Sequence, residues 1–384
     1  MTGQCIETGP RQIAIRHIEL LAAQIRLPSP AGNARAKWKE RRSILLRLWT
    51  EDGLVGQGEA APLPGYSSDD WRGCAEELLQ LEATTLSFMA PAPCVWELER
   101  FFCQIPPLKN PAAVFALEMA LLDLLGQLSD RPAHRLMRAD GRTLRPIPLA
   151  TLVRGATPQA VIACAHEAYA RGIRVFKFKL GRPGRWHQEW RTLKHLAEAL
   201  PLDAKLRIDV NGAWNLDEAS RRLQALSAIG PELVEEPVAP NHLDQLAPGL
   251  VPIALDESLQ GPGWRQRLIA AAARGVCQAI VLKPMALGGM ARCLEMAALA
   301  RSLGITVIVT HLFDGPLGLA AAAELALALG DDIGPCGLDR HCALYAWSPS
   351  SVPQVGPSAL TAAPGAGLCL SALAFPKQGE MVRL

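Results

Sequence analysis

Two lysines stand two residues apart in the otherwise apolar segment VFKFKLG, residues 175–181. On a β-strand successive side chains point to opposite faces, so Lys177 and Lys179 share one face while the two phenylalanines and the leucine share the other. A half-exposed antiparallel strand with two solvated lysines would show the same pattern. In a parallel β/α barrel, the aromatic face would pack against helices and both amines would enter the lumen, where they could act on a bound molecule.

Ionisable residues also end the next four apolar segments. The segments LRIDVNGAW, ELVEEPV, PIALDES and AIVLKP end in Asp209, in Glu235 and Glu236, in Asp256 and Glu257, and in Lys283. Each of these residues alone could be a helix cap or a surface residue. In a barrel the carboxyl ends of the strands meet at one face, so we expect these side chains to converge where barrel enzymes carry their active sites.

Carboxylates that converge in this way repel one another unless they are protonated or bind a cation. A set of oxygen ligands without histidine or cysteine suits a hard ion such as Mg²⁺. Lysines beside such an ion, beside another lysine and partly removed from water are expected to have pKa values lowered toward neutrality. A lysine with such a pKa is a usable general base.

An alternation of short apolar strands and amphipathic helices supports this placement. Seven strands are expected, ending near Thr151, Lys179, Val210, Glu235, Asp256, Lys283 and Thr310, and a weaker eighth is expected around residues 332–338. The strands recur at intervals of roughly 20 to 35 residues, as in βα units. One long βα array favours a (β/α)7β TIM-like barrel over an open doubly wound sheet.

The flanking segments predict an α+β capping domain. Residues 12–54 predict strand, loop and strand, with the loop at 28–42, and the pair Asn110-Pro111 begins a long apolar helix. After residue 344 a tail rich in Pro, Ser, Ala and Gly loses the alternation, so we expect it to return to the N-terminal domain. The expected division is a capping domain at 1–140, a barrel at 141–343 and a returning segment at 344–384.

Composition narrows the class of protein. A net charge of +2 without a long basic block argues against nucleic-acid and anionic-membrane partners. The ten cysteines form no CxxC pair and are expected to be reduced and mostly buried. Charged residues interrupt the N-terminal segment where a signal peptide would be apolar, so a cytoplasmic protein is expected. The apolar stretch 315–330 contains Glu324 and is too short to span a bilayer, so no membrane segment is predicted.

The motifs together resemble the enolase superfamily, in its muconate-lactonising branch, over nearly the whole chain. They are KFK at 177–179, DVNGAW at 209–214, EEP at 235–237, DES at 256–258 and KP at 283–284. The resemblance implies that Asp209, Glu235 and Asp256 bind Mg²⁺. It also implies that Lys179 and Lys283 stand on opposite faces of the substrate, with Lys177 lowering the pKa of Lys179. The shared step of this superfamily is removal of a proton alpha to a carboxylate.

Within that family, the stretch GEAAPLPGYSSDDW at 58–71 and the GLD at 337–339 resemble o-succinylbenzoate synthases of menaquinone biosynthesis. This resemblance implies a syn elimination of water from 2-succinyl-6-hydroxy-2,4-cyclohexadiene-1-carboxylate to give 2-succinylbenzoate. Lys179 would remove the proton and then protonate the departing hydroxyl, while Lys283 would stabilise the intermediate electrostatically. The expected partner is a small carboxylate substrate, and a homo-oligomer is left open.

Other functions remain open on the sequence alone. N-succinylamino acid racemisation would use both lysines as acid and base. Dipeptide epimerisation would use the two lysines in the same way. Dipeptide epimerases usually carry an Asp-x-Asp pair near the last strand, whereas this chain has Asp339 and His341 there, which weakens that interpretation. A Schiff-base aldolase acting through Lys179, or a non-catalytic binding barrel, represents a different class.

Four further features of the sequence are each open to two interpretations. The basic residues 37–42 could bind the succinyl carboxylate or simply be solvated, and Arg207 could form a structural ion pair or contact the substrate. His311 and Asp314 could line the mouth of the site or belong to an ordinary turn.

Overall fold

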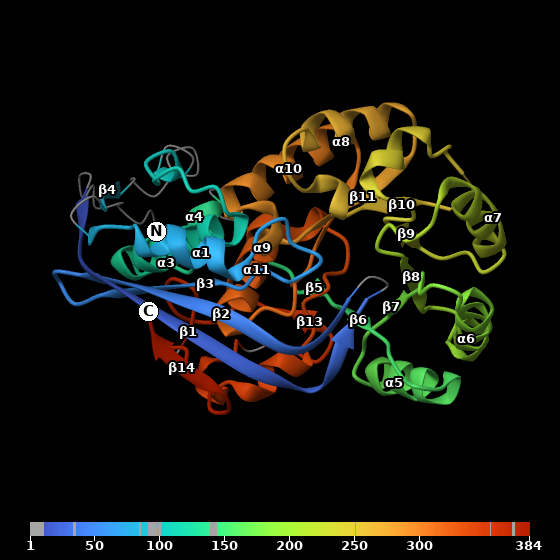
Figure 1. The fold of residues 1–384 in the computed structure, drawn as a ribbon, viewed down its shortest axis with the longest axis horizontal. Helices are drawn as coiled ribbons and strands as arrows, with labels where there is room; N and C mark the ends of the chain where they lie inside the picture. The colour runs from blue at the N-terminus through green and yellow to red at the C-terminus, as the bar shows by residue number, and fades with distance from the viewer. Residues whose placement is uncertain are drawn as a thin grey trace, which may run out of the picture.

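The computed structural model describes residues 11–33, 36–83, 86–90, 98, 101–138, 144–249, 251–353, 355–370 and 373–384. Figure 1 shows two units side by side, an antiparallel sheet with its helices and a curled parallel sheet surrounded by helices. The first ten residues, Cys5, Cys94 and the expected boundary at residue 140 lie outside the described residues. The eight cysteines in the described ranges are all free thiols, five of them buried.

The N-terminal unit is built on a five-stranded antiparallel sheet. Its path is β14-β1-β2-β3, and β4 also pairs with β1. The strands are β1 (Arg11–Gly32), β2 (Lys37–Thr50), β3 (Val55–Ala60), β4 (Ser87–Ala90) and β14 (Glu380–Arg383). β14 pairs with β1 through Leu21↔Arg383 and its neighbours, so the end of the described chain lies in the N-terminal unit.

The prediction of a loop at 28–42 is wrong. Residues 28–32 belong to β1 and residues 37–42 belong to β2, with Ala31 opposite Trp38 and Gly32 opposite Lys37. The reason is an alternation that the Pro, Gly and Lys content conceals: Trp38 is buried while Lys37 and Lys39 on either side are exposed. A period of two is the pattern of a strand with one buried face.

Among the described helices of this unit, α1 (Trp71–Leu79) and α3 (Pro111–Ser129) pack on the sheet, while α4 (Ala133–Met137) packs on α3 and on α11 (Pro316–Leu329) of the second unit. The predicted helix start is confirmed, because Asn110 is the N-cap of α3 and Pro111 its first residue. A Cβ atom at Gly58 would lie 1.9 Å from the carbonyl oxygen of Ala116, so glycine lets α3 pack directly on β3. By length and hydropathy α3 could cross a membrane, yet 78% of its apolar window is buried within the fold.

The second unit contains a seven-stranded parallel sheet with the unbroken order β6 to β12. Its strands are β6 (Ala150–Leu152), β7 (Val175–Lys179), β8 (Lys205–Asp209), β9 (Leu233–Glu235), β10 (Ile253–Leu255), β11 (Cys277–Leu282) and β12 (Thr306–Val309). The helices are α5 (Pro158–Ala170), α6 (Trp186–Ala199), α7 (Leu216–Ser227), α8 (Trp264–Ala273), the short α9 (Pro284–Leu287), α10 (Met290–Ser302) and α11 (Pro316–Leu329).

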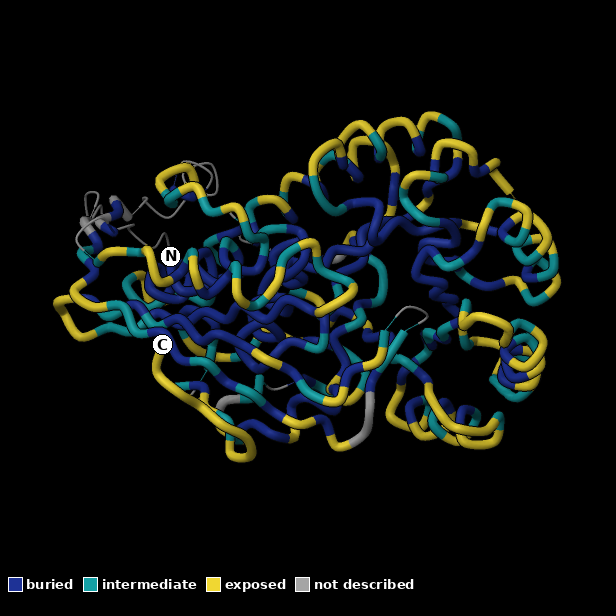
Figure 2. Tube along the Cα trace, in the orientation of Figure 1, coloured by how far each residue is buried: buried dark blue, intermediate teal, exposed yellow. Residues whose placement is uncertain are grey.

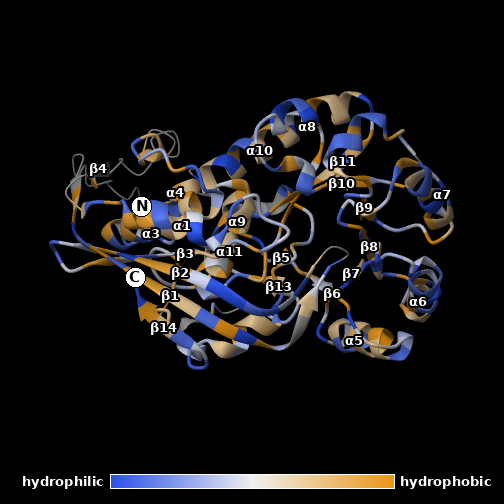
Figure 3. Ribbon diagram, viewed as in Figure 1, coloured by the Kyte–Doolittle hydropathy of each residue, from blue (hydrophilic) through white to orange (hydrophobic). Residues whose placement is uncertain are grey.

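The burial of side chains in both units follows the hydrophobic pattern of the sequence. Figure 2 shows buried residues along the strands and exposed residues on the outward turns of the helices. In Figure 3, β10 and β11 are largely apolar, whereas α6 and α7 mix polar and apolar residues. Local signals start these helices: Thr157 caps α5 before Pro158, and Asn215 with Glu218 forms a capping box on α7.

The weak eighth strand closes the sheet without forming a regular strand. Isolated parallel bridges join Leu149 to Cys336 and Thr310 to Gly337, so residues 333–337 lie between β12 and the segment that leads into β6. Pro335 has no N–H to donate, and Gly334 and Gly337 weaken a continuous ladder. The result is the (β/α)7β TIM-like barrel expected from the sequence. The short strands β5 (Ile147–Pro148) and β13 (Ala359–Leu360) pair beside it.

Arg41 on β2 joins the two units. Its side chain is 3% exposed and donates to the carbonyl oxygens of Pro62 at 3.0 Å, Ala61 at 2.5 Å and Phe313 at 3.1 Å. Phe313 belongs to the segment that follows β12. One guanidinium therefore satisfies buried carbonyl groups of both the capping unit and the barrel.

Arg41→Met is expected to lower the free energy of unfolding by about 3 kcal/mol, because it leaves buried carbonyl groups without donors at similar side-chain volume. Urea denaturation would measure the change. The matched control is Arg42→Met, since Arg42 is exposed and its ion pair in the described structure is with Glu40 at 3.2 Å. Equal stability of the two variants would show that Arg41 does not hold the units together.

Candidate active site

Strand register brings the predicted residues to one level of the barrel. Lys179 on β7 is paired with Asp209 on β8, and Asp209 is paired with Glu235 on β9. Because neighbouring parallel strands are in register, residues at their carboxyl ends form a ring around the lumen. The phenylalanines of β7 are buried on the opposite face, as the alternation in VFKFKLG predicted.

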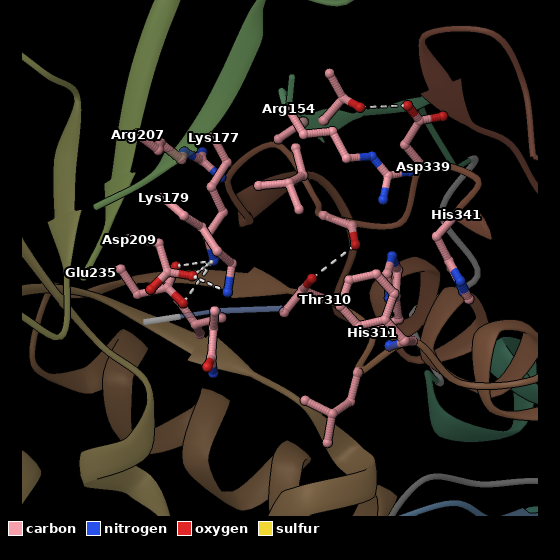
Figure 4. Close-up of a pocket in the computed structure, with 18 of the residues that line it drawn as sticks. Arg154, Lys177, Lys179, Arg207, Asp209, Glu235, Thr310, His311, Asp339 and His341 are labelled. Carbon is pink, nitrogen blue, oxygen red and sulfur yellow. Dashed lines mark hydrogen bonds and ion pairs between the residues drawn. The ribbon is translucent and has the colours of Figure 1, made fainter. Parts of the chain in front are cut away.

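Two amines and three carboxylates meet in this ring. The Nζ atom of Lys177 lies 2.8 and 2.7 Å from the two carboxylate oxygens of Glu235 and 2.9 Å from Oδ2 of Asp209. The Nζ atom of Lys283 is bonded to Oδ2 of Asp256 and lies 3.7 Å from Oε1 of Glu235. Figure 4 shows Lys177, Asp209 and Glu235 pointing toward one another. The structure thus brings together all three predicted metal ligands.

Lys179 reaches the same cluster from the end of β7. Its Nζ atom lies 3.2 Å from Oδ2 of Asp209 and donates to Oδ1 of Asn211 at 3.1 Å. Asn211 has a φ of 52°, in the left-handed region that asparagine tolerates better than most residues. It also donates to Oε1 of Glu257 at 3.1 Å, which fixes the orientation of its amide. Asn211 is therefore a residue that orients Lys179.

The second acidic residue of the EEP motif has a supporting position. Glu236 has a φ of 42° and accepts hydrogen bonds from the backbone N–H of Asp256 at 2.8 Å and from the hydroxyl of Ser258. These contacts hold the start of the DES motif in place. Glu235, the glutamate predicted as a metal ligand, is the one of the pair that contacts Lys177 and Lys283.

Electrostatics in the cluster are dominated by burial and by the close charges. Burial would raise the pKa of Asp209, but Lys177 and Lys179 outweigh it and hold that pKa below its usual range. For Glu235, burial together with the negative charge of Asp209 raises the pKa to about 7. One carboxylate is thus firmly ionised beside a neighbour that resists ionisation, as expected when like charges share a buried site.

The expected lowering of lysine pKa values is not found for Lys177 and Lys283. Burial alone would lower both, but the carboxylates of Asp209 and Glu235 around Lys177, and of Asp256 and Glu235 around Lys283, raise their pKa values instead. Each ammonium acts here as a counter-ion to the acidic groups. The expectation of lowered lysine pKa values assumed that a dication, and not the lysines, balances the charge of the carboxylates.

The donor chemistry fits Mg²⁺, since three buried carboxylates converge here and supply oxygen ligands. Oδ2 of Asp209 is buried and faces the ammonium groups of Lys177 at 2.9 Å and Lys179 at 3.2 Å, so this oxygen already lies in a strongly positive environment. Within the described ranges, no three His, Cys, Asp or Glu side chains already lie as close as the ligands of one ion. The ammonium groups stand between the carboxylates, so an ion would take their place.

Tyr66 is a site residue that sequence reasoning did not identify. It lies in the capping unit, and its hydroxyl donates to Oδ1 of Asp256 at 2.5 Å and accepts from Nζ of Lys283 at 3.0 Å. Burial and the charge of Asp256 raise the pKa of Tyr66 well above its usual value, so the phenol stays neutral. The available signal was its position within the stretch at 58–71 that carried the resemblance.

A cavity of about 430 Å³ opens above the cluster. Its lining comes from both units and includes Trp38, Tyr66, Lys179, Lys283, His311 and His341. Trp38 lies near the tip of the β1–β2 hairpin, whereas Lys37 and Lys39 are exposed to solvent. The aromatic residue of that segment, and not its lysines, therefore lines the site.

The structure also places the three remaining candidates, Arg207, Asp314 and His311, relative to the cavity. Arg207 donates to Oε2 of Glu232 at 2.5 Å and to the carbonyl of Pro335 at 2.7 Å, so it forms a structural ion pair in the barrel wall, and it also lines the cavity. Asp314 is buried, accepts from the backbone N–H of Leu312 at 3.2 Å, and does not line the cavity. His311 does line the cavity.

Comparison with known proteins agrees with this architecture. Residues 160–371 match the family described as "Enolase C-terminal domain-like". Residues 16–138 match the family described as "Mandelate racemase / muconate lactonizing enzyme, N-terminal domain". The two matches cover both structural units.

Individual relatives have several different activities. A chloromuconate cycloisomerase from Cupriavidus pinatubonensis is 31% identical over 79% of this chain and 82% of that protein. An o-succinylbenzoate synthase from Desulfotalea psychrophila is 30% identical over 77% of this chain and 85% of that protein.

Among solved structures, a dipeptide epimerase from Methylococcus capsulatus complexed with Mg and the dipeptide L-Arg-D-Lys has a TM-score of 0.76. It is 27% identical and covers 93% of this chain and 99% of its own. The chain therefore belongs to the enolase superfamily, in the mandelate racemase and muconate lactonizing enzyme group.

Proposed function

We propose that this enzyme removes a proton alpha to a carboxylate and eliminates water from 2-succinyl-6-hydroxy-2,4-cyclohexadiene-1-carboxylate, giving 2-succinylbenzoate. The observation that carries the proposal is the placement of Lys179 and Lys283 on either side of the three carboxylates. Lys179 ends β7 and Lys283 follows β11, with β8, β9 and β10 between them. A substrate carboxylate in the lumen would have an amine on each side.

Mg²⁺ is the cofactor in this proposal, held by Asp209, Glu235 and Asp256. When bound, it supplies positive charge that stabilises the negative charge developing on the substrate carboxylate. It is also expected to replace the ammonium groups of Lys177 and Lys283 as the counter-charge to the carboxylates. The relative from Methylococcus capsulatus, which was solved with Mg, supports this choice of ion.

The chain's own residues carry out the proton transfers. Lys179 as free amine takes the alpha proton, and the resulting ammonium returns a proton to the departing hydroxyl on the same face of the ring, so water leaves. Lys283, on the other side, stabilises the developing negative charge. Lys177, held between Asp209 and Glu235, keeps positive charge near Lys179. Asn211 directs the Lys179 amine toward the cavity.

Dehydration is preferred over dipeptide epimerisation because the carboxylate of Asp339 is already paired with other side chains. Both oxygens of this carboxylate accept from Arg171, at 3.1 and 2.8 Å, and one also accepts from the hydroxyl of Thr151 at 2.7 Å. A carboxylate neutralised in this way has little charge left for the ammonium of a dipeptide. The second acidic residue of the epimerase pair is replaced by His341. The synthase relative and the stretch at 58–71 support the same choice.

Racemisation of N-succinylamino acids is the second candidate, favoured by the same pair of lysines on opposite sides of the site. The purified protein with Mg²⁺ is to be tested on the cyclohexadiene substrate and, separately, on an N-succinylamino acid in deuterated water. Formation of 2-succinylbenzoate supports the dehydratase. Alpha-deuterium exchange without any 2-succinylbenzoate would replace it with the racemase.

An aldolase acting through Lys179 predicts a different result in a simple experiment. Borohydride would then trap a covalent adduct with a carbonyl substrate, and chelation by EDTA would have no effect. The carboxylate cluster predicts the opposite pair of results. Activity should be lost with EDTA and restored by Mg²⁺, and no borohydride adduct should form.

A further inference from the structure

The cavity has a second polar wall, composed of Arg154, His311 and His341, which we call the distal wall. Figure 4 shows these three residues across the cavity from Asp209 and Glu235. Arg154 follows β6, His311 follows β12, and His341 follows the bridging segment that closes the barrel. No step of the proposed dehydration uses any of them.

Arg154 brings a positive charge to the distal wall, and no acidic group in the described part of the chain pairs with it. Its guanidinium donates to Sγ of Cys342 at 3.8 Å, and none of the carboxylates in the described ranges forms an ion pair with it. The acidic residues on this side of the cavity, Asp339 and Glu167, act instead on Arg171. The side chain of Arg154 is exposed where the cavity opens, so a ligand can reach it.

His341 has unused hydrogen-bonding capacity at the same wall. It is 6% exposed, and neither ring nitrogen has a hydrogen-bond partner in the described structure. Its ring lies 4.1 Å from that of His311, between centroids, and meets Phe313 edge-on at 5.7 Å. Buried polar atoms without partners are costly, and a polar group of a bound molecule would relieve that cost.

His311 and His341 are both neutral, so they can form hydrogen bonds but add no charge to the distal wall. Burial, then the neighbouring His311, Arg41 and Arg154, hold the pKa of His341 well below its ordinary value. Burial likewise lowers the pKa of His311 to about 3, and its Nδ1 accepts from the backbone N–H of Phe313 at 3.0 Å. The distal wall thus offers one cation and a neutral imidazole N–H.

We propose that Arg154 and His341 determine specificity by binding a second carboxylate of the substrate. This inference rests on the proposed function, in which the first carboxylate lies between Lys179 and Lys283. Arg154 supplies the ion pair and His341 donates a hydrogen bond. The wall would reject a substrate that ends in an ammonium group, and it fits the succinyl carboxylate of the cyclohexadiene substrate.

Two matched pairs of compounds test this assignment by calorimetry at saturating Mg²⁺. One pair is 2-succinylbenzoate and 2-butyrylbenzoate, and the other is N-succinyl-L-phenylalanine and N-butyryl-L-phenylalanine. In each pair only the distal carboxylate differs. The wild-type protein is expected to bind the succinyl compound about 10- to 100-fold more tightly than the butyryl compound, as is usual for a charged hydrogen-bonded pair.

Arg154→Gln is expected to reduce this preference at least about 10-fold while leaving the affinity for the butyryl compounds and for Mg²⁺ unchanged. His341→Phe, which keeps a ring beside His311 but removes both nitrogens, should reduce the preference by about 3- to 10-fold. The control is Arg191→Gln, an exposed arginine on α6 outside the cavity lining, which should behave as wild type.

The outcomes separate this inference from the proposed function. Wild-type protein that shows no preference for either succinyl compound, or an Arg154→Gln variant that keeps the full preference, would overturn the assignment. If the preference is present and depends on Arg154, but no 2-succinylbenzoate forms from the cyclohexadiene, the assignment stands and the proposed dehydration is wrong.

Discussion

Lys179→Ala is expected to lower kcat by about 10³-fold, the contribution typical of a well-placed general base. Lys179 Nζ lies at the carboxyl end of β7 within the cavity lining, 3.2 Å from Oδ2 of Asp209 and 3.1 Å from Oδ1 of Asn211. Removing the amine removes both the base and the acid of the proposed elimination. Steady-state assay of 2-succinylbenzoate formation measures the loss.

The variant should keep its fold and bind Mg²⁺ at least as tightly as the wild type, because Asp209, Glu235 and Asp256 are all retained and the ammonium 3.2 Å from Asp209 is removed. Circular dichroism and metal titration check both properties. Lys194→Ala, at an exposed position on α6, is the matched control and should retain full activity. If Lys179→Ala retained more than about a tenth of the wild-type kcat, Lys179 would not be the base.

Glu235→Gln is expected to weaken Mg²⁺ binding by at least about 100-fold and to abolish measurable turnover at ordinary Mg²⁺ concentrations. Glu235 lies between Lys177 and Lys283 and contacts both, so it is the central member of the carboxylate set. The amide keeps the shape of the side chain but loses its negative charge. With both lysines retained, the site becomes more positive and repels a dication.

Titration calorimetry with Mg²⁺ gives the affinity, and the same assay gives the activity. The matched control is Glu295→Gln, an exposed glutamate on α10 that pairs with Arg265. That variant should bind Mg²⁺ as the wild type does. Unchanged Mg²⁺ affinity in Glu235→Gln would remove Glu235 from the set of metal ligands.

The barrel and its ring of site residues could be predicted because both depend on local patterns. The two-residue period of VFKFKLG separates lysines from phenylalanines, and parallel register then places Lys179 beside Asp209. The position of Lys283 follows in the same way from the end of β11. These predictions needed only strand ends and alternation.

The features that were missed depend on contacts between distant segments. Tyr66 reaches Asp256 across 190 positions of the chain, and Arg41 reaches Phe313 across 272. No local pattern identifies such partners. The alternation around Trp38 was local, but its Pro, Gly and Lys content resembled that of a loop. The raised pKa values of Lys177 and Lys283 depend on the actual spacing of charges within the lumen.

The central claim is that Asp209, Glu235 and Asp256 share one divalent ion with lysines on either side. A crystal structure of the protein grown with Mn²⁺ in place of Mg²⁺ tests it most directly, since the anomalous signal locates the ion. A single peak is expected within about 2.3 Å of one oxygen from each of the three carboxylates. A peak elsewhere, or carboxylates that stay paired with Lys177 and Lys283 while the ion is absent, would contradict it.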